Sequence, residues 1–273
     1  MKRVLRNLGF SAIMAVVVLG GAELFLRLVS EPSLYIDEHT PIWRLRPDIQ
    51  RPVRFVERGT EFGVRTNALG WRGDEPQPGA LLCLGDSTTF GWGVEEDEAW
   101  PALVDGAVNG GVPGYSTFQG LARIDEAMST EPSQVLLAFL VRDAELAPMA
   151  DHERPSVSAP SNLALLRTIR SLRPAPGPRD GPAVHRVPPE RYRANLVALI
   201  EQVRSAGAEP LLFAFPMVEQ ANEHLAVLEE LADAEGIPLF APELDHGLFF
   251  EEDPIHLTVE GNARLAEALE GWL

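Results

Sequence analysis

The sequence predicts an α/β fold: a three-layer α/β/α sandwich on a mostly parallel sheet, preceded by an N-terminal transmembrane helix. Short apolar runs recur from residue 80 onward, as expected for parallel strands buried on both faces. Amphipathic helical patterns lie between these runs, and strands that alternate with helices form doubly wound sheets. An uncharged apolar segment follows three basic residues at the start of the chain. The 273 residues, 45% of them hydrophobic, suffice for one domain with appendages.

The N-terminal segment has the length and polarity of a membrane anchor. Residues 8–22 carry no charge, and the apolar stretch continues through "ELFLRLV" to residue 29. A helix over residues 8–29 would be about 33 Å long, which is enough to cross a bilayer. Glu23 and Arg27 are four residues apart, so a helix would pair them on one face near the outer interface. The positive charges expected to stay in the cytoplasm are those of Lys2, Arg3 and Arg6.

A cleavable signal peptide is the alternative interpretation of this segment. The small residues Gly20, Gly21 and Ala22 suit a signal peptidase site. The apolar stretch beyond them favours an uncleaved anchor within residues 1–30. We therefore expect a single-pass protein of the cell membrane whose folded part is extracytoplasmic, in the periplasm or outside the cell. If the N-terminus is cleaved, the protein is expected to be secreted.

Charge and cysteine content narrow the possible functions. The net charge of −17 includes three N-terminal positive charges, so the rest of the chain carries about −20. Such an acidic body repels phosphate backbones, so we expect no nucleic-acid partner. Cys83 is the single cysteine, which excludes an intramolecular disulfide. Its place between two leucines is typical of a small core residue and less typical of a catalytic thiol.

Two regions follow the anchor. Residues 31–78 form a juxtamembrane segment in which "VRFVERGTEFGVRTN" predicts a small hairpin around Arg58 and Gly59. Residues 79–273 hold the alternating strands and helices. The strands predicted there are the apolar runs at 80–84, 135–141, 210–216 and 237–240.

Three amphipathic helices are predicted in the second region. The middle one ends at Gly236, a natural C-cap, and the last one begins after Thr258 as N-cap. Six prolines interrupt residues 171–189, which we predict to be an insertion loop. The apolar stripes of the helices are Tyr192, Leu196, Leu199, Ile200 and Val203; Leu225, Leu228, Leu231 and Ala232; and Leu265, Leu269 and Trp272.

The run "LLCLGDSTTFGWG" ends a predicted strand in a candidate nucleophile. Ligands of open α/β sheets bind at the carboxyl ends of strands, and Ser87 lies just beyond the first strand of the region. Gly-Asp-Ser is equally a good turn and helix N-cap, and this interpretation stays open. The segment lacks the G-x-S-x-G pattern, so the usual α/β-hydrolase fold is not indicated.

A nucleophilic serine needs a base, and the base needs a group that orients it. His256 directly precedes the last helix, in an expected loop, and Asp253 lies three residues before it. In a tight turn stiffened by Pro254, the carboxylate accepts from Nδ1–H and leaves Nε2 free for a serine. A capping aspartate beside a surface histidine is the alternative. The histidines expected to be solvated are His39, His152, His185 and His224.

Three sequence blocks together resemble the GDSL or SGNH hydrolase family. They are "LGDSTTFGWG" near the start of the second region, "NGGVPGYST" further along and "DPIHLTVEGNARLA" at its end. In addition, "RTNALGWRGDE" resembles the segment that precedes the domain in membrane-anchored bacterial members. The resemblance covers residues 79–273 and implies the flavodoxin-like fold of an SGNH hydrolase domain.

The resemblance implies roles for four residues. Ser87 corresponds to the nucleophile, His256 to the general base and Asp253 to its partner. This family holds the oxyanion with the backbone N–H of the nucleophile, a glycine N–H and an asparagine side chain. Gly114, in "VPGYST", corresponds to that glycine, and Gly111 is the alternative if the loop is shifted.

A fourth block departs from the family pattern. The family has G-x-N-D where this chain reads "LVRDAE", so Leu140 replaces the glycine, Arg142 replaces the asparagine and Asp143 remains. Losing one oxyanion donor costs on the order of 3 kcal/mol. Arg142 can supply a charged donor to the oxyanion or bind a substrate anion. It can also pair with Asp143 or Glu145 and leave the oxyanion hole one donor short, and the sequence does not decide.

The sequence therefore predicts a serine esterase or lipase-like hydrolase that cleaves ester bonds through an acyl-enzyme outside the cytoplasmic membrane. No residues have metal-ligand spacing and no Gly-rich phosphate loop occurs, so we expect neither a metal nor an organic cofactor. The expected substrate is an acylated small molecule, lipid or glycan, and the N-terminal helix is the expected membrane contact. The alternatives are an O-acyltransferase that modifies envelope polysaccharide and a non-catalytic envelope protein with a degraded oxyanion hole.

Overall fold

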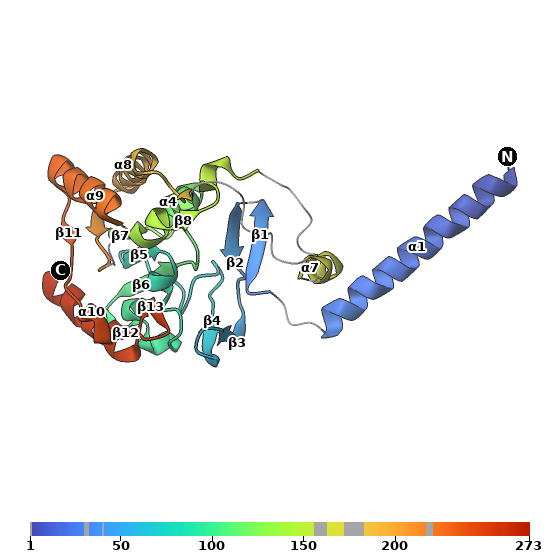
Figure 1. The fold of residues 1–273 in the computed structure, drawn as a ribbon, viewed down its shortest axis with the longest axis horizontal. Coiled ribbons are helices and arrows are strands. Elements are labelled where there is room, and N and C mark those ends of the chain that lie inside the picture. The colour runs from blue at the N-terminus through green and yellow to red at the C-terminus, as the bar shows by residue number, and fades with distance from the viewer. Residues whose placement is uncertain (1, 30–32, 40, 156–162, 172–182, 217–220) are drawn as a thin grey trace.

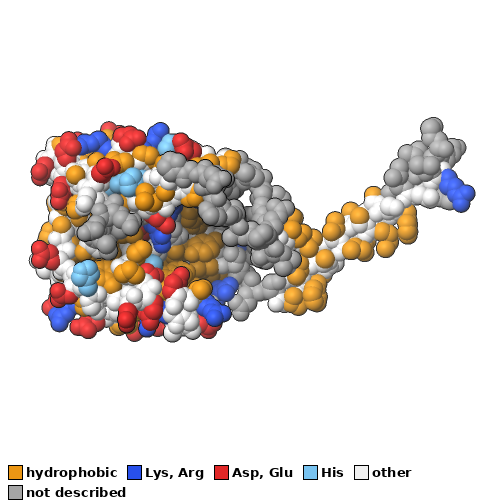
Figure 2. All heavy atoms as spheres, in the orientation of Figure 1, with side chains coloured by type: hydrophobic (Ala, Val, Ile, Leu, Met, Phe, Trp, Pro, Cys, Tyr) orange, Lys and Arg blue, Asp and Glu red, His pale blue; other side chains and the backbone are white. Residues whose placement is uncertain are grey.

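A long helix stands away from an α/β body in the computed structural model, which describes residues 2–29, 33–39, 41–155, 163–171, 183–216 and 221–273 (Figure 1). This helix, α1 (Lys2–Val29), contains the predicted anchor. Its segment Gly9–Val29 is long and apolar enough to cross a membrane, and its hydrophobic side chains are exposed along the helix (Figure 2). Arg27 Nε donates to Glu23 Oε1 at 2.6 Å, which confirms the predicted pair.

Five parallel strands form the central sheet of the described residues and confirm the predicted fold class. Their order is β11-β10-β7-β5-β6, and each neighbouring pair is parallel. This is the doubly wound, flavodoxin-like order, in which the winding reverses between β5 and β7. The strands are β5 (Leu81–Gly85), β6 (Ala107–Gly111), β7 (Gln134–Ala138), β10 (Glu209–Phe213) and β11 (Leu239–Phe240).

The residues of β6 do not predict a strand. Its sequence, AVNGG, has low strand propensity. It forms because β5 pairs with it along its whole length, from Leu81 opposite Ala107 to Gly85 opposite Gly111. A Cβ at Gly111 would lie 2.3 Å from the Phe90 nitrogen, so glycine allows the helix after β5 to pack against this strand.

Helices cover both faces of the sheet and complete the three layers (Figure 1). Alternate residues of β5 belong to different hydrophobic clusters: Leu82 packs with the residues of α8 and α9, whereas Cys83 packs with those of α3 and α10. Both faces are thus buried, as the apolar runs predict. Cys83 is fully buried and is a core residue. The helices of these layers are α3 (Trp100–Leu103), α4 (Thr117–Ala122), α5 (Ile124–Met128), α8 (Pro189–Ser205), α9 (Asn222–Glu235) and α10 (Val259–Trp272).

The predicted helix caps and apolar stripes are confirmed. Gly236 closes α9 in the left-handed conformation, and the side chain of Thr258 accepts a hydrogen bond from the Gly261 nitrogen at the start of α10. The five stripe residues of α8 are all buried. Because these stripes face the sheet, the helical spacing of apolar residues in the sequence predicts which side chains are buried.

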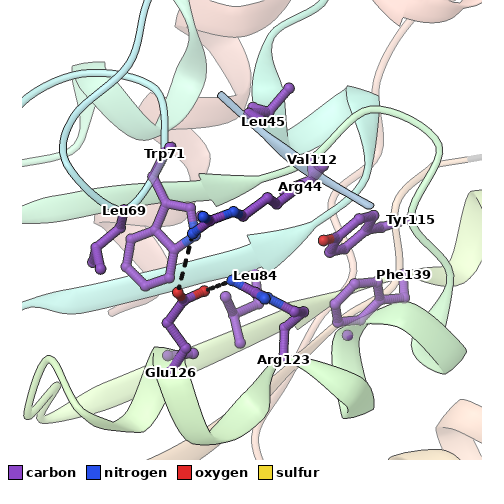
Figure 3. A pocket seen from close by; sticks show the side chains of 14 residues that line it. Arg44, Leu45, Leu69, Trp71, Leu84, Val112, Tyr115, Arg123, Glu126 and Phe139 are labelled. Carbon is purple, nitrogen blue, oxygen red and sulfur yellow. Dashed lines mark hydrogen bonds and ion pairs between the residues drawn. The ribbon is translucent and has the colours of Figure 1, made fainter. Parts of the chain in front are cut away.

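The described residues between α1 and the sheet, 33–39 and 41–78, pack onto the α/β body. The predicted hairpin of this segment is formed by β3 (Gln50–Phe55) and β4 (Thr60–Arg65), and a second antiparallel pair, β1 (Tyr35–His39) and β2 (Ile42–Leu45), precedes it. Figure 3 shows Arg44 of β2 and Arg123, which both pair with Glu126 of α5, beside a cavity of about 20 Å³. A cavity of that size holds about one water, so little empty space separates this segment from the sheet, and the segment is part of the core.

The predicted insertion loop is ordered at both of its described ends. Residues 172–182 lie outside the described residues. Helix α7 (Ala164–Ser171) precedes them, and β9 (Val184–His185) follows, paired antiparallel with β8 (Leu146–Ala147). The loop prediction is therefore wrong over 184–185, because β8 supplies a partner that local composition does not reveal.

Candidate active site

The turn after β5 presents Ser87 at the start of a short helix, α2 (Ser87–Phe90). Asp86 is the N-cap, and its Oδ1 accepts from both the nitrogen and the hydroxyl of Thr88 at 2.8 Å. The capping role suggested for Gly-Asp-Ser thus belongs to Asp86. The hydroxyl of Ser87 takes no part in capping and is left for other contacts.

Ser87, His256 and Asp253 form one hydrogen-bonded chain. Ser87 Oγ lies 2.8 Å from His256 Nε2, and His256 Nδ1 lies 2.6 Å from Asp253 Oδ2. His256 is buried, which contradicts the alternative of a surface histidine beside a capping aspartate. The serine and histidine are 169 residues apart in the sequence, so the tertiary fold brings them together.

The expected loop around His256 is a strand. Residues Asp253–Leu257 form β13, paired antiparallel with β12 (Phe249–Phe250). In a regular strand, side chains three residues apart point to opposite faces. The side chains of Asp253 and His256 meet in spite of this rule, in a strand whose pairing is irregular between Phe249 and Phe250. The loop prediction is wrong because residues 253–257 pair with Phe249 and Phe250, which lie just before them in the sequence.

The surroundings of His256 favour an ionised partner and a shielded ring. Burial raises the pKa of Asp253, but the hydrogen bond and charge of His256 outweigh burial, so this pKa lies below its usual range. The Phe55 ring lies 6.3 Å and the Trp92 ring 6.5 Å from the imidazole, centroid to centroid. Phe55 comes from the β3–β4 hairpin, so the juxtamembrane segment helps to enclose the site.

Two backbone N–H groups remain available beside this chain of residues. Within the described part of the chain, neither Ser87 nor Gly114 donates a hydrogen bond from its backbone nitrogen. Gly114 has a φ of +85°, which a residue with a side chain rarely adopts. The N–H of Gly111, the alternative donor, is directed to Asn109 Oδ1 at 3.1 Å. Gly114 is therefore the better candidate of the two glycines.

Arg142 contacts the candidate nucleophile. It lies on α6 (Leu140–Ala144), and its Nη2 donates to Ser87 Oγ at 3.2 Å while Nη1 donates to Glu145 Oε2 at 3.0 Å. Asp143 points away and accepts from Thr117 N at 2.8 Å and from the Thr117 hydroxyl. Burial raises the pKa of Asp143 well above its usual range. The sequence left open whether Arg142 reaches the site or pairs with Asp143 or Glu145. In the structure it pairs with Glu145 and also reaches Ser87.

Arg186 is a buried residue that no sequence pattern singles out. Its Nη2 donates to Gly114 O at 2.8 Å and to Asp151 Oδ2 at 2.7 Å, and its Nη1 donates to Glu145 Oε2 at 3.2 Å. Asp151 is fully buried and balances this charge. One guanidinium thus ties the Gly114 loop to Glu145, the partner of Arg142.

Arg72, in "RTNALGWRGDE", holds the opposite side of the nucleophile turn. Its Nη1 donates to Phe90 O at 2.9 Å and Gly91 O at 2.7 Å, and its Nη2 donates to Gly63 O at 2.8 Å and Val94 O at 2.7 Å. Burial lowers the pKa of Arg72 to about 10. The segment before the domain therefore supports the turn that carries Ser87.

The prediction of solvated histidines is wrong for His224. Its side chain is fully buried, its Nε2 lies 2.7 Å from Val187 O, and its ring lies 4.7 Å from that of His185. Burial lowers the pKa of His224. His152 is exposed as predicted, and the side chain of His39 lies outside the described residues. The neighbours of His224 are polar because they occupy the outer face of α9.

The location of the site agrees with the topology of the sheet. Ser87 follows β5 and Arg142 follows β7, the two strands between which the winding reverses. Open α/β sheets bind ligands at this switch point. A Ser–His–Asp chain beside free backbone donors is the arrangement of serine hydrolases, which form acyl-enzymes.

Comparison with known proteins gives the family. The sequence model of the GDSL-like lipase/acylhydrolase family matches residues 83–264, which is more than half of the chain. The chain therefore belongs to this family of ester-hydrolysing SGNH enzymes. No curated protein matches the chain significantly.

Two solved structures show the same fold. One is a protein described as lipolytic, of the G-D-S-L family, from Desulfitobacterium hafniense DCB-2; it has a TM-score of 0.51 and 18% identity, over 71% of this chain and 99% of that chain. The other is the psychrotrophic esterase EstA from Pseudoalteromonas sp., inhibited by monoethylphosphonate. It has a TM-score of 0.50 and 15% identity, over 71% of this chain and 96% of that chain.

Proposed function

We propose that this protein hydrolyses carboxylic esters through an acyl-enzyme on Ser87. The Ser87 oxygen attacks the ester carbonyl carbon while its proton moves to His256 Nε2. The tetrahedral intermediate then breaks its bond to the leaving alcohol, which receives that proton. Water attacks the acyl-serine with the same base and releases a carboxylic acid and free Ser87. The 2.8 Å distance between Ser87 Oγ and His256 Nε2 is the observation that carries this proposal.

Three donors are proposed to stabilise the oxyanion of each tetrahedral intermediate. Two are the backbone N–H groups of Ser87 and Gly114, which donate no hydrogen bond to the described residues. The third is Arg142, in the place of the family's asparagine. Its 3.2 Å contact with Ser87 Oγ supports a charged donor that strengthens as negative charge develops. The same contact argues against a degraded oxyanion hole.

We propose that α1 is an uncleaved anchor and that the hydrolase body lies outside the cytoplasmic membrane. The exposed apolar span Gly9–Val29 follows basic residues at the N-terminus, which supports a cytoplasmic start. Acylated small molecules, lipids or envelope glycans are then the accessible substrates. Neither a metal nor an organic cofactor takes part in the proposed steps.

Ester hydrolysis with a chromogenic short-chain ester tests the reaction. Ser87→Ala is expected to abolish turnover, and Asp253→Asn is expected to lower kcat by roughly 10⁴-fold because it fixes the wrong imidazole tautomer. Ser205→Ala, at an exposed position at the end of α8, is the matched control and should remain fully active. Activity that survives in Ser87→Ala would refute the assignment. Transfer of the acyl group to an added glycan in place of water would refute hydrolysis as the main reaction.

A reporter fusion tests the location. Alkaline phosphatase fused after residue 273 folds only after export, so we expect it to be active in cells. An inactive reporter would refute export. Detection of a mature N-terminus at Glu23 would replace the anchor with a cleaved signal peptide.

A further inference from the structure

Helix α7 (Ala164–Ser171) packs against α1 and not against the hydrolase core. Its sequence, ALLRTIRS, contains four apolar residues and no acidic one. Neither hydrophobic cluster of the described residues includes a residue of α7. Instead, α7 contacts α1 near the end that faces the α/β body (Figure 1). An amphipathic helix with no place in the core needs another cover for its apolar side chains.

The carboxylate of Glu23 joins the two helices. Its Oε1 accepts from Ala164 N at 3.0 Å and its Oε2 accepts from Leu165 N at 2.9 Å. These are N–H groups of the first turn of α7, which have no partner within the helix. Arg27 holds the same carboxylate from the next turn of α1. The one acidic residue of the span is thereby paired, and it fixes where α7 begins.

The position of this contact sets the depth of α7 relative to the span. Glu23 lies six residues before Val29, the end of the apolar span, which corresponds to about 9 Å along the helix axis. Figure 1 shows α7 nearly end-on while α1 lies in the plane of the view, so α7 runs across α1. If α1 crosses the bilayer, α7 lies along the membrane surface beside the last turns of the span.

The apolar side chains of α7 and of Leu163 are partly exposed at the depth set by Glu23. Leu163, just before the helix, is 37% exposed, and Ile169 is 43% exposed. Leu165 and Leu166 are only half-buried. Helices that lie in the membrane interface bury an apolar face by about 5–10 Å, which matches the depth set by Glu23.

We infer that α7 is an interfacial helix that inserts Leu163 and Ile169 into the outer leaflet, at the boundary between headgroups and acyl chains. This inference rests on the proposed membrane anchoring by α1. The partner is the lipid surface itself. With one crossing helix and one surface helix joined at Glu23, the hydrolase body has a defined height and orientation over the membrane, which a single flexible anchor does not provide.

Depth-dependent quenching in the full-length protein tests this inference. The protein with I169C is labelled with an environment-sensitive fluorophore and placed in vesicles of phosphatidylcholine and phosphatidylglycerol. The native Cys83 is fully buried and stays unlabelled. The matched control is V259C on α10, on the opposite side of the body, where Val259 is 47% exposed and Ile169 is 43% exposed (Figure 1).

We expect lipids that carry a doxyl group near the headgroup to quench the I169C label at least about twofold more than the V259C label. Equal quenching at the two positions, in protein that resists alkaline extraction, would overturn the inference and leave the anchor in place. Release by alkaline extraction would overturn both. Glu23→Ala in the I169C protein removes the carboxylate that holds α7, so quenching should fall toward the V259C value. Unchanged quenching would overturn the role of Glu23.

Discussion

Arg142 takes the place of the asparagine in the family pattern, and its removal tests the proposed oxyanion hole. The guanidinium contacts Ser87 Oγ at 3.2 Å and is one-fifth exposed, so the charge acts in a partly shielded site. A unit charge about 4 Å from the oxyanion contributes about 4 kcal/mol at an effective dielectric constant of about 20. Glu145 pairs with Nη1 of Arg142, whereas Nη2 contacts Ser87.

The opposing charge of Glu145 cancels roughly half of this attraction, which leaves about 2 kcal/mol. Arg142→Ala should therefore lower kcat/KM by about 30-fold, within a range of roughly tenfold to a thousandfold. Arg142→Asn restores the family's donor without a charge that disfavours the imidazolium of His256, so it should retain or raise activity. Folding should change little, because the side chain belongs to neither hydrophobic cluster of the described residues.

The assay is the pH-resolved kcat/KM for a short-chain chromogenic ester, with unfolding midpoints measured in parallel. Arg204→Ala removes an exposed ion pair with Glu235 and is the matched control, with no expected change in rate. If Arg142→Ala keeps full activity while Ser87→Ala abolishes it, the electrostatic reasoning is refuted. The oxyanion hole would then depend on the Ser87 and Gly114 amides alone.

Three further predictions concern buried polar residues around the site. Arg186→Lys keeps the charge but cannot reach Gly114 O, Asp151 and Glu145 together, so kcat should fall by roughly tenfold with KM little changed. Added guanidinium should partly restore the activity of Arg186→Ala. An unchanged kcat in Arg186→Lys would contradict the role of Arg186 in positioning the Gly114 loop and Glu145. Arg72→Met removes a charged donor from four carbonyl oxygens, of which Phe90 O keeps Asn109 Nδ2, and should lower the free energy of unfolding in urea by roughly 3 kcal/mol or more, whereas a loss under about 1 kcal/mol would count against the supporting role of Arg72. Burial raises the pKa of Asp143, so its contribution to stability is full below the unfolded pKa of about 4 and is lost as the pH rises through the folded pKa. Asp143→Asn does not titrate, so its stability relative to the wild type should grow from acidic to alkaline pH, and a pH-independent difference in urea unfolding would contradict this.

The sequence alone predicts the strands that form the core of the sheet. The predicted runs 80–84 and 135–141 are apolar at every position because parallel strands are buried on both faces, and that burial leaves a continuous signal in the chain. The second prediction runs too far, because β7 ends at Ala138 and α6, which is also buried, begins at Leu140. Strand β6 escapes prediction because its glycines serve close approaches, Gly111 that of α2 and Gly110 that of residues of β5. Its strand conformation comes from β5, a partner that local propensity cannot see.

The residues of the proposed triad could be selected from the sequence because each motif contains its own local chemistry: Asp253 and His256 are three residues apart, and Ser87 lies just beyond a strand end. The sequence left open whether Arg142 reaches the site or pairs with an acidic neighbour, since a long side chain turns toward whichever charges the fold places nearby. Glu145 and Ser87 lie 3 and 55 residues away from it in sequence. Arg186 and Gly114 are 72 residues apart, and Glu23 and Ala164 are 141 apart. Contacts across 55 or more residues leave no period or motif in the chain, and they exist only once the packed elements have brought these groups within hydrogen-bond distance.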